Sequence, residues 1–93
     1  MAKFAAFVQY TEDEARVTEI RPEHREYLSG LLESGKMHQS GPFIDGSGAL
    51  IIYNAEDLAE AQVLLANDPF SVNGIITSAE LKEWKIVFDG SNS

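Results

Sequence analysis

KFAAFVQY, at residues 3–10, and ALIIY, at residues 49–53, are the two stretches that decide how this chain folds. Both are short and rich in aromatic and β-branched residues, which is typical of β-strands. Side chains alternate between the two faces of a strand, and in both stretches the positions on either face are apolar. Such strands belong at the centre of a sheet that is covered on both sides.

Proline and polar capping residues mark two helices between the strands. Arg21-Pro22 predicts the start of a first helix that runs to about Ser34, because proline fits the first helical turn. Residues 11–20 are polar and irregular and predict a connection. Asn54 predicts the cap of a second helix, and Asp68-Pro69 ends it because the residue before proline avoids the α region. The predicted buried stripes are Tyr27, Leu28, Leu31 and Leu32 in the first helix, and Leu58, Ala59, Leu65 and Ala66 in the second.

Two more strands complete the pattern. Residues 36–40 predict a second strand and residues 75–81 a fourth, which residues 84–88 extend. The order β-α-β-β-α-β is that of the ferredoxin-like α+β fold, an antiparallel four-stranded sheet with both helices on one face. The helix-free face would expose apolar side chains, which a second subunit can cover. We therefore expect a homodimer or a higher assembly of dimers.

Length, charge and cysteine content limit the kinds of function that this chain can have. The 93 residues predict a single domain, with residues 89–93 as a loose tail. Fifteen acidic residues against seven basic ones give a net charge of −8, which disfavours binding to nucleic acid or to an anionic membrane. The sequence contains no cysteine and no metal-ligand spacing, so we expect neither disulfides nor a metal site. It also lacks the apolar run of a signal peptide or membrane span, which predicts a cytoplasmic protein.

His24 and Asp68 are the candidate catalytic residues. His24 precedes Leu28 by one helical turn and so lies on the inward stripe. It is also near the expected N-terminus of the first helix, which favours the neutral imidazole that can accept a proton. Both helices pack on one sheet face, so Asp68 can reach His24, orient the imidazole and stabilise its protonated form. The alternative is that each residue only caps or ends its own helix.

Ser40, Gly41, Pro42 and Phe70 are the candidate substrate-binding residues. Backbone N–H groups or the hydroxyl at residues 40–42 could bind a ligand, although a plain turn after a strand is the alternative. Phe70 directly follows Asp68-Pro69. His38 is interpreted as structural, and Trp84 as a core or interface residue. No pattern indicates a phosphate loop or a covalent nucleophile.

Several short motifs together resemble the YciI-like, or YCII-related, family. They span residues 4–88 and are Arg21-Pro22-Glu23-His24, Glu33-Ser34-Gly35-Lys36, Ser40-Gly41-Pro42, Asn54-Ala55-Glu56-Asp57, Asn67-Asp68-Pro69-Phe70 and Trp84-Lys85-Ile86-Val87-Phe88. The resemblance implies a dimeric α/β-barrel assembly of ferredoxin-like domains, with a site built around a histidine and an aspartate, here His24 and Asp68. Relatives are linked to the dehydrochlorination of chlorinated hydroxyaromatics. The loop after Gly41-Pro42 is shorter here than in some relatives, which puts any particular substrate in doubt.

Two functions are consistent with these residues. In the first, a cofactor-free enzyme uses His24 and Asp68 for acid/base elimination or isomerisation of a small cyclic or hydroxyaromatic compound. In the second, the same cleft of a dimeric protein binds a small molecule without turning it over. The sequence does not choose between a lyase or isomerase and a binding module.

Overall fold

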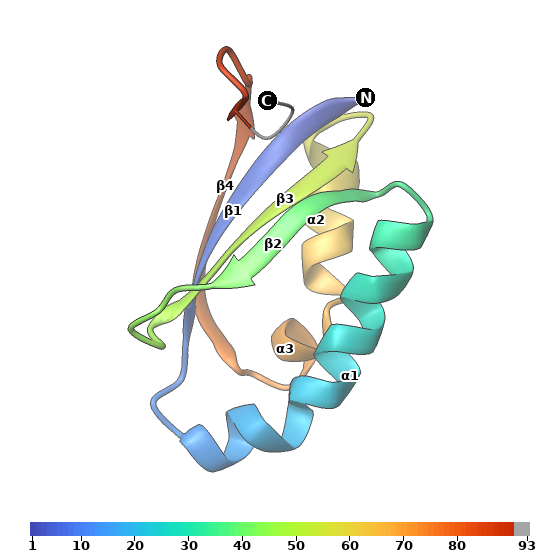
Figure 1. Ribbon diagram of the computed structural model, residues 1–93. Coiled ribbons are helices and arrows are strands. Elements are labelled where there is room, and N and C mark those ends of the chain that lie inside the picture. The colour runs from blue at the N-terminus through green and yellow to red at the C-terminus, as the bar shows by residue number, and fades with distance from the viewer. Residues whose placement is uncertain (91–93) are drawn as a thin grey trace.

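The computed structural model describes residues 1–90 as a sheet with helices on one side (Figure 1). In chain order the elements are β1 (Ala2–Tyr10), α1 (Glu14–Glu33), β2 (Met37–Pro42), β3 (Gly48–Ala55), α2 (Leu58–Ala66), α3 (Pro69–Val72) and β4 (Ile76–Trp84). This is the predicted β-α-β-β-α-β order, with the short helix α3 added before the last strand. Of the predicted loose tail, residues 91–93 lie outside the described residues.

The sheet places the two doubly apolar strands at its centre. Its order is β2-β3-β1-β4, and every neighbouring pair is antiparallel. The helices lie over one face, as Figure 1 shows. Phe4, Ala6 and Val8 of β1, with Ile51 and Tyr53 of β3, form the almost fully buried helix-facing side. The predicted ferredoxin-like α+β fold is therefore confirmed.

Two strand boundaries differ from the prediction. β2 extends to Pro42, so the segment from Ser40 to Pro42 pairs with β3 and is strand rather than turn. β4 is continuous and ends at Trp84, so residues 85–88 do not extend the sheet. Trp84 is 44% exposed because it ends an edge strand, and its interpretation as a core residue is wrong.

α1 begins at Glu14, inside the segment predicted as a connection. Asp13 caps it, because its side chain accepts a hydrogen bond from the backbone N–H of Arg16 at 3.2 Å. Pro22 lies within the helix, so the predicted start at Arg21-Pro22 is wrong. A proline inside a helix costs a backbone hydrogen bond and adds strain. The helical turns before Pro22 offset this cost, because they bury the apolar side chains of Val17 and Ile20.

The buried stripe of α1 consists of Val17, Ile20, His24 and Leu28. The first two pack in one cluster with residues from α3 and the start of β4. Of the predicted stripe Leu28 is buried, but Leu32 is 55% exposed. His24 lies in the third turn of the helix. The predicted effect of the helix N-terminus on its imidazole does not apply, because the dipole acts mainly within the first turn.

α2 begins at Leu58, four residues after the predicted cap. Asp57 is the cap, since its carboxylate accepts from the backbone N–H of Glu60 at 2.9 Å. Asn54 lies in β3 instead, where its side chain bonds across to neighbouring backbone and side-chain groups. The inward-facing residues of α2 are Ala61, Leu64 and Leu65, spaced three and four residues apart. Of the four residues predicted for this stripe, only Leu65 faces inward.

Candidate active site

His24 enters the protein interior from the buried stripe of α1. The residue is only 8% exposed. Helices α1 and α3 contact each other, which brings the imidazole close to the start of α3. A polar ring at such a position needs a hydrogen-bonding partner.

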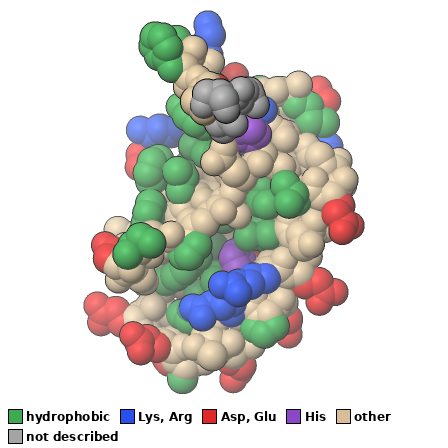
Figure 2. Space-filling model, in the orientation of Figure 1, with side chains coloured by type: hydrophobic (Ala, Val, Ile, Leu, Met, Phe, Trp, Pro, Cys, Tyr) green, Lys and Arg blue, Asp and Glu red, His purple; other side chains and the backbone are tan. Residues whose placement is uncertain are grey.

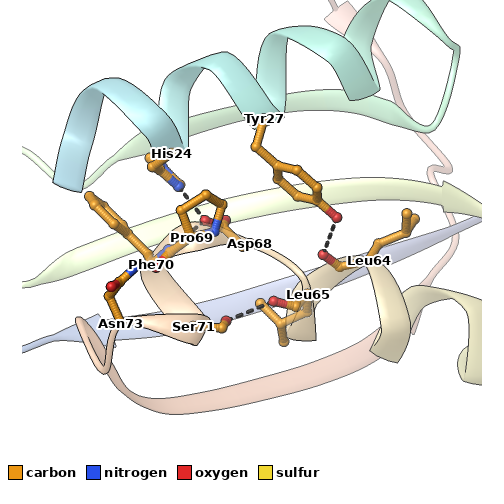
Figure 3. Close-up of polar contacts among 9 residues, drawn as sticks. All are labelled: His24, Tyr27, Leu64, Leu65, Asp68, Pro69, Phe70, Ser71 and Asn73. Carbon is orange, nitrogen blue, oxygen red and sulfur yellow. Dashed lines mark hydrogen bonds and ion pairs between the residues drawn. The ribbon is translucent and has the colours of Figure 1, made fainter.

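Asp68 supplies that partner (Figure 3). Its Oδ1 atom lies 2.7 Å from Nδ1 of His24 and also accepts the backbone N–H of Phe70 at 2.9 Å. The second bond makes Asp68 the N-cap of α3, where the following proline suits the first helical position. The predicted meeting of His24 and Asp68 is confirmed. The prediction that Asp68 ends the second helix is wrong, because Asn67 is the C-cap of α2 and Asp68 begins the next helix.

Aromatic rings hold the imidazole in place. The ring of Phe70 is parallel to that of His24, with an interplanar angle of 1° and centroids 3.9 Å apart. Tyr10 packs edge-on against Phe70, with the ring centroids 5.2 Å apart and an interplanar angle of 81°. The imidazole is thus fixed by one hydrogen bond at its edge and one stacked ring on its face. A carboxylate at Nδ1 selects the tautomer with its proton there and leaves Nε2 as an acceptor.

Two buried polar atoms near the pair have no hydrogen-bond partner among the described residues: Oδ2 of Asp68 and the hydroxyl of Tyr53. Burial raises the pKa of the Tyr53 phenol well above its ordinary value of 10.0, and the charge of Asp68 raises it further. Burial likewise raises the pKa of Tyr10 and of Tyr27, again with a contribution from Asp68. The phenols around the carboxylate therefore stay protonated at neutral pH.

The raised pKa of Tyr53 predicts a specific loss of stability in alkali. In the folded chain this phenol keeps its proton beyond pH 10, whereas in the unfolded chain it ionises near its ordinary pKa. The protonated phenol makes its full contribution to the free energy of unfolding below about pH 10. Above that pH the contribution falls by up to about 1.4 kcal/mol per pH unit. Urea unfolding from about pH 8 to about pH 11 should therefore show a shallower decline for Tyr53→Phe than for the wild type.

Tyr27→Phe is the matched control for this experiment. The Tyr27 hydroxyl donates to the carbonyl oxygen of Leu64 at 2.6 Å and is only partly buried. Its removal should change the alkaline slope less than removal of the Tyr53 hydroxyl. Equal slopes in wild type and Tyr53→Phe would contradict the prediction.

A pocket of about 360 Å³ opens beside the His24 imidazole. The four predicted substrate-binding residues, Ser40, Gly41, Pro42 and Phe70, all line it together with His24. Asp68 is not in the lining and is fully buried behind the imidazole. The remaining lining residues, which the sequence analysis missed, are Tyr10, Arg21, Arg25, Leu28, Ala49 and Ile51.

The sequence spacing of Arg21 and Arg25 could have identified them as pocket residues. They are four residues apart on a helix, so they lie on the same side of α1 one turn apart. His24 lies between them in sequence. This spacing holds whether the helix starts at Glu14 or at Arg21, but in the sequence analysis Arg21 served only as a helix start and Arg25 was not considered.

Within residues 1–90 no group of three or more His, Asp or Glu side chains could hold a metal ion. His38 lies at an irregularity in the pairing of β2 with β3, and its Nε2 atom is buried without a hydrogen-bond partner in the described residues. None of the helices described here has the length and apolarity needed to cross a bilayer.

The chain is similar to a family model, a bacterial protein and a solved structure. A model of the YCII-related domain matches residues 2–85. The uncharacterized protein YjpA of Bacillus subtilis is 35% identical over 65 residues, which cover 68% of this chain and 73% of that protein. A solved structure, the 5-chloro-2-hydroxyhydroquinone dehydrochlorinase of Burkholderia phenoliruptrix in complex with 2,5-dihydroxybenzoquinone, superposes with a TM-score of 0.79 at 22% identity. The superposition covers 89% of this chain and 93% of that one, and at this identity it supports the fold alone.

Proposed function

Because this chain belongs to the YCII-related domain family, we propose that it is a cofactor-free enzyme acting on a small cyclic or hydroxyaromatic compound by elimination or isomerisation. The observation that carries the proposal is the buried His24–Asp68 pair, 2.7 Å apart, at the wall of a pocket. A histidine oriented by a carboxylate is the usual arrangement of a general base. The pocket is of the size that takes a single-ring compound.

In the proposed reaction His24 moves the proton. Asp68 holds the hydrogen on Nδ1, so Nε2 accepts a proton from the substrate. In an elimination the electron pair of the broken bond to hydrogen forms the new double bond, and chloride leaves with the electrons of the C–Cl bond. The substrate thus loses one proton and one chloride with no external oxidant or reductant. Asp68 stabilises the imidazolium until the proton passes to water.

Ser40, Gly41, Pro42 and Phe70 have binding roles in this proposal. They line the pocket opposite or beside the imidazole. The Ser40 hydroxyl is the group among them that can donate to a substrate oxygen. Pro42 and Phe70 present apolar surface to a flat ring, which suits a hydroxyaromatic compound.

A chloride-release assay tests the proposal. The dehydrochlorinase of similar fold acts on 5-chloro-2-hydroxyhydroquinone, so this compound is the first substrate to offer, under anaerobic conditions. Chloride is measured with a selective electrode and the quinone product by its absorbance. Acceleration above the buffer rate supports an enzyme. Binding of this compound and of related hydroxyaromatics without any acceleration would instead favour the small-molecule-binding module.

We also propose that two copies pair through the helix-free face of the sheet. Phe7 on this face is 52% exposed, and its ring stacks with that of Phe43 at 6.5 Å between centroids. A groove beside them is lined by Leu50 and Ile52 among others. Apolar surface of this kind favours burial against a second copy.

Light scattering coupled to size exclusion measures this assembly. The wild type should elute with at least twice the chain mass of 10.2 kDa. Phe7→Asp should shift it toward the monomer, because it places a charge in the proposed interface. Val63→Asp, at a position that is 56% exposed on α2, is the control and should leave the mass unchanged. A monomeric wild type at micromolar concentration would overturn the proposal.

A further inference from the structure

The pocket beside His24 carries positive charge in an otherwise acidic chain. Arg21 and Arg25 are two of the seven basic residues of the sequence, and both line the pocket. None of the fifteen acidic residues is in the lining. Figure 2 shows Lys and Arg side chains gathered against one of the two histidines, next to hydrophobic side chains. A local concentration of cations in a protein of net charge −8 is a departure that needs an explanation.

Neither arginine forms an ion pair with another described residue, although Arg21 also borders a second hollow, which Glu12, Glu14 and Asp45 line as well. The ion pairs among residues 1–88 join Arg16 to Glu19, Lys36 to Glu60, Lys82 to Glu80 and His24 to Asp68. Arg21 and Arg25 take part in none of these pairs. Surface arginines that stabilise a helix usually pair with a carboxylate three or four residues away. These two lie one turn apart on the same side of α1 and can therefore bind one ligand together.

The electrostatics of Tyr10 place both charges within reach of the pocket interior. Tyr10 lines the same pocket. Burial and the charge of Asp68 raise the pKa of its phenol, and the charges of Arg21 and Arg25 act in the opposite direction. An oxyanion beside this hydroxyl would be attracted by the same two guanidinium groups, against the opposing effects of burial and of the Asp68 charge. The rest of the wall, including Leu28, Ile51 and Phe70, is apolar.

We infer that the pocket selects a flat ring carrying an ionised oxygen, which Arg21 and Arg25 bind while the ring lies against the apolar wall. Guanidinium groups are suited to such oxygens because they donate planar, charge-assisted hydrogen bonds. The shared chemistry is an aromatic or quinonoid oxyanion, whether an ionised hydroxyl or a carboxylate. This inference rests on the proposed function and adds the charge of the substrate to it. An anionic ring next to Nε2 would also favour the imidazolium that forms when His24 takes the proton.

Calorimetric titration of the whole protein tests the inference without any turnover. The first probe is 2,5-dihydroxybenzoquinone, which is ionised at neutral pH, and its neutral counterpart is 2,5-dimethoxy-1,4-benzoquinone. We expect the ionised probe to bind at least about tenfold more tightly, with an affinity that falls as salt is added. Benzoate as a second probe separates carboxylate from ionised hydroxyl, and arginine-dependent binding of either anion supports the inference.

Arg21→Gln and Arg25→Gln should each weaken binding of the ionised probe by about ten- to a hundredfold, the usual value of a hydrogen bond to a charged group. They should leave the neutral probe unaffected. Arg16→Gln is the matched control, because Arg16 lies on the same helix, pairs with Glu19 and does not line the pocket. Thermal melts verify that each variant is folded.

Equal affinity for the ionised and neutral probes, or unchanged affinity in both arginine variants, would overturn the inference. The proposed enzymatic function fails in a different way, since it is tested by chloride release. Arginine-dependent binding of the anion without turnover would retain the anion site and reject the enzyme. Turnover that is indifferent to Arg21 and Arg25 would retain the enzyme and reject the anion site.

Discussion

His24→Asn is expected to lower turnover of a dehydrochlorination substrate by about 10²- to 10⁴-fold, the usual contribution of a positioned general base. Asparagine is the informative replacement because its side-chain NH₂ can occupy the place of Nδ1 and still donate to Asp68. Only Nε2 is lost, which is the nitrogen that the Nδ1 bond to Asp68 leaves available. The effect should fall on kcat more than on KM, because the lost group acts on the proton and not on ground-state binding.

Glu23→Gln is the control for this variant. Glu23 neighbours His24 in the sequence but is exposed, so its replacement should leave kcat within about twofold of the wild type. Both variants are assayed by chloride release after their folding is verified by circular dichroism. Unchanged turnover in His24→Asn would show that the pair only stabilises the packing of α1 on α3.

Asp68→Ala is expected to destabilise the protein by about 3–5 kcal/mol, because two hydrogen bonds to a buried charged acceptor are lost, each usually about 1.5–3 kcal/mol. The carboxylate is fully buried and serves two donors, Nδ1 of His24 and the backbone N–H of Phe70. Alanine leaves both donors inside the protein without an acceptor and opens a small cavity as well. Urea unfolding at neutral pH measures the change.

Two other variants separate the roles of Asp68. Asp57→Ala removes a cap that serves only the backbone of α2, and it should cost about 1 kcal/mol. Asp68→Asn keeps an oxygen for the N–H of Phe70 but removes the charge, so it should cost less stability than alanine. It should still lower turnover, because a neutral amide does not stabilise an imidazolium. Similar losses of stability in Asp68→Ala and Asp57→Ala would contradict the role of the buried pair.

The centre of the sheet was predictable because the pattern in it is strong. In β1 and β3 apolar residues occupy both faces, and only a central position satisfies such strands. Helix boundaries were harder, since they depend on single residues that can act in more than one place. Pro22 was read as a helix start, but burial of Val17 and Ile20 carries the helix back to Asp13. Proline restricts the chain locally, whereas the packing that overrides it is formed by residues far along the sequence.

The candidate site could be predicted only in part. The stripe position of His24 requires a buried partner, and the topology puts Asp68 within reach of it. The arrangement of Phe70 over the imidazole depends on the short helix α3, which has too few residues for a periodic signal. The spacing of Arg21 and Arg25 places them on one side of α1, but whether that side borders the pocket depends on how α1 packs, which their spacing does not specify.

The contact between His24 and Asp68 joins positions 44 residues apart. Everything between them, from the middle of α1 through β2, β3 and α2, must be in place before the two side chains meet. Closing so long a segment is entropically expensive, and contacts of this kind form late unless they belong to the folding nucleus. The proposed chemistry therefore has no precursor in a partly folded chain: a refolding molecule brings His24 and Asp68 together only when its two halves have docked.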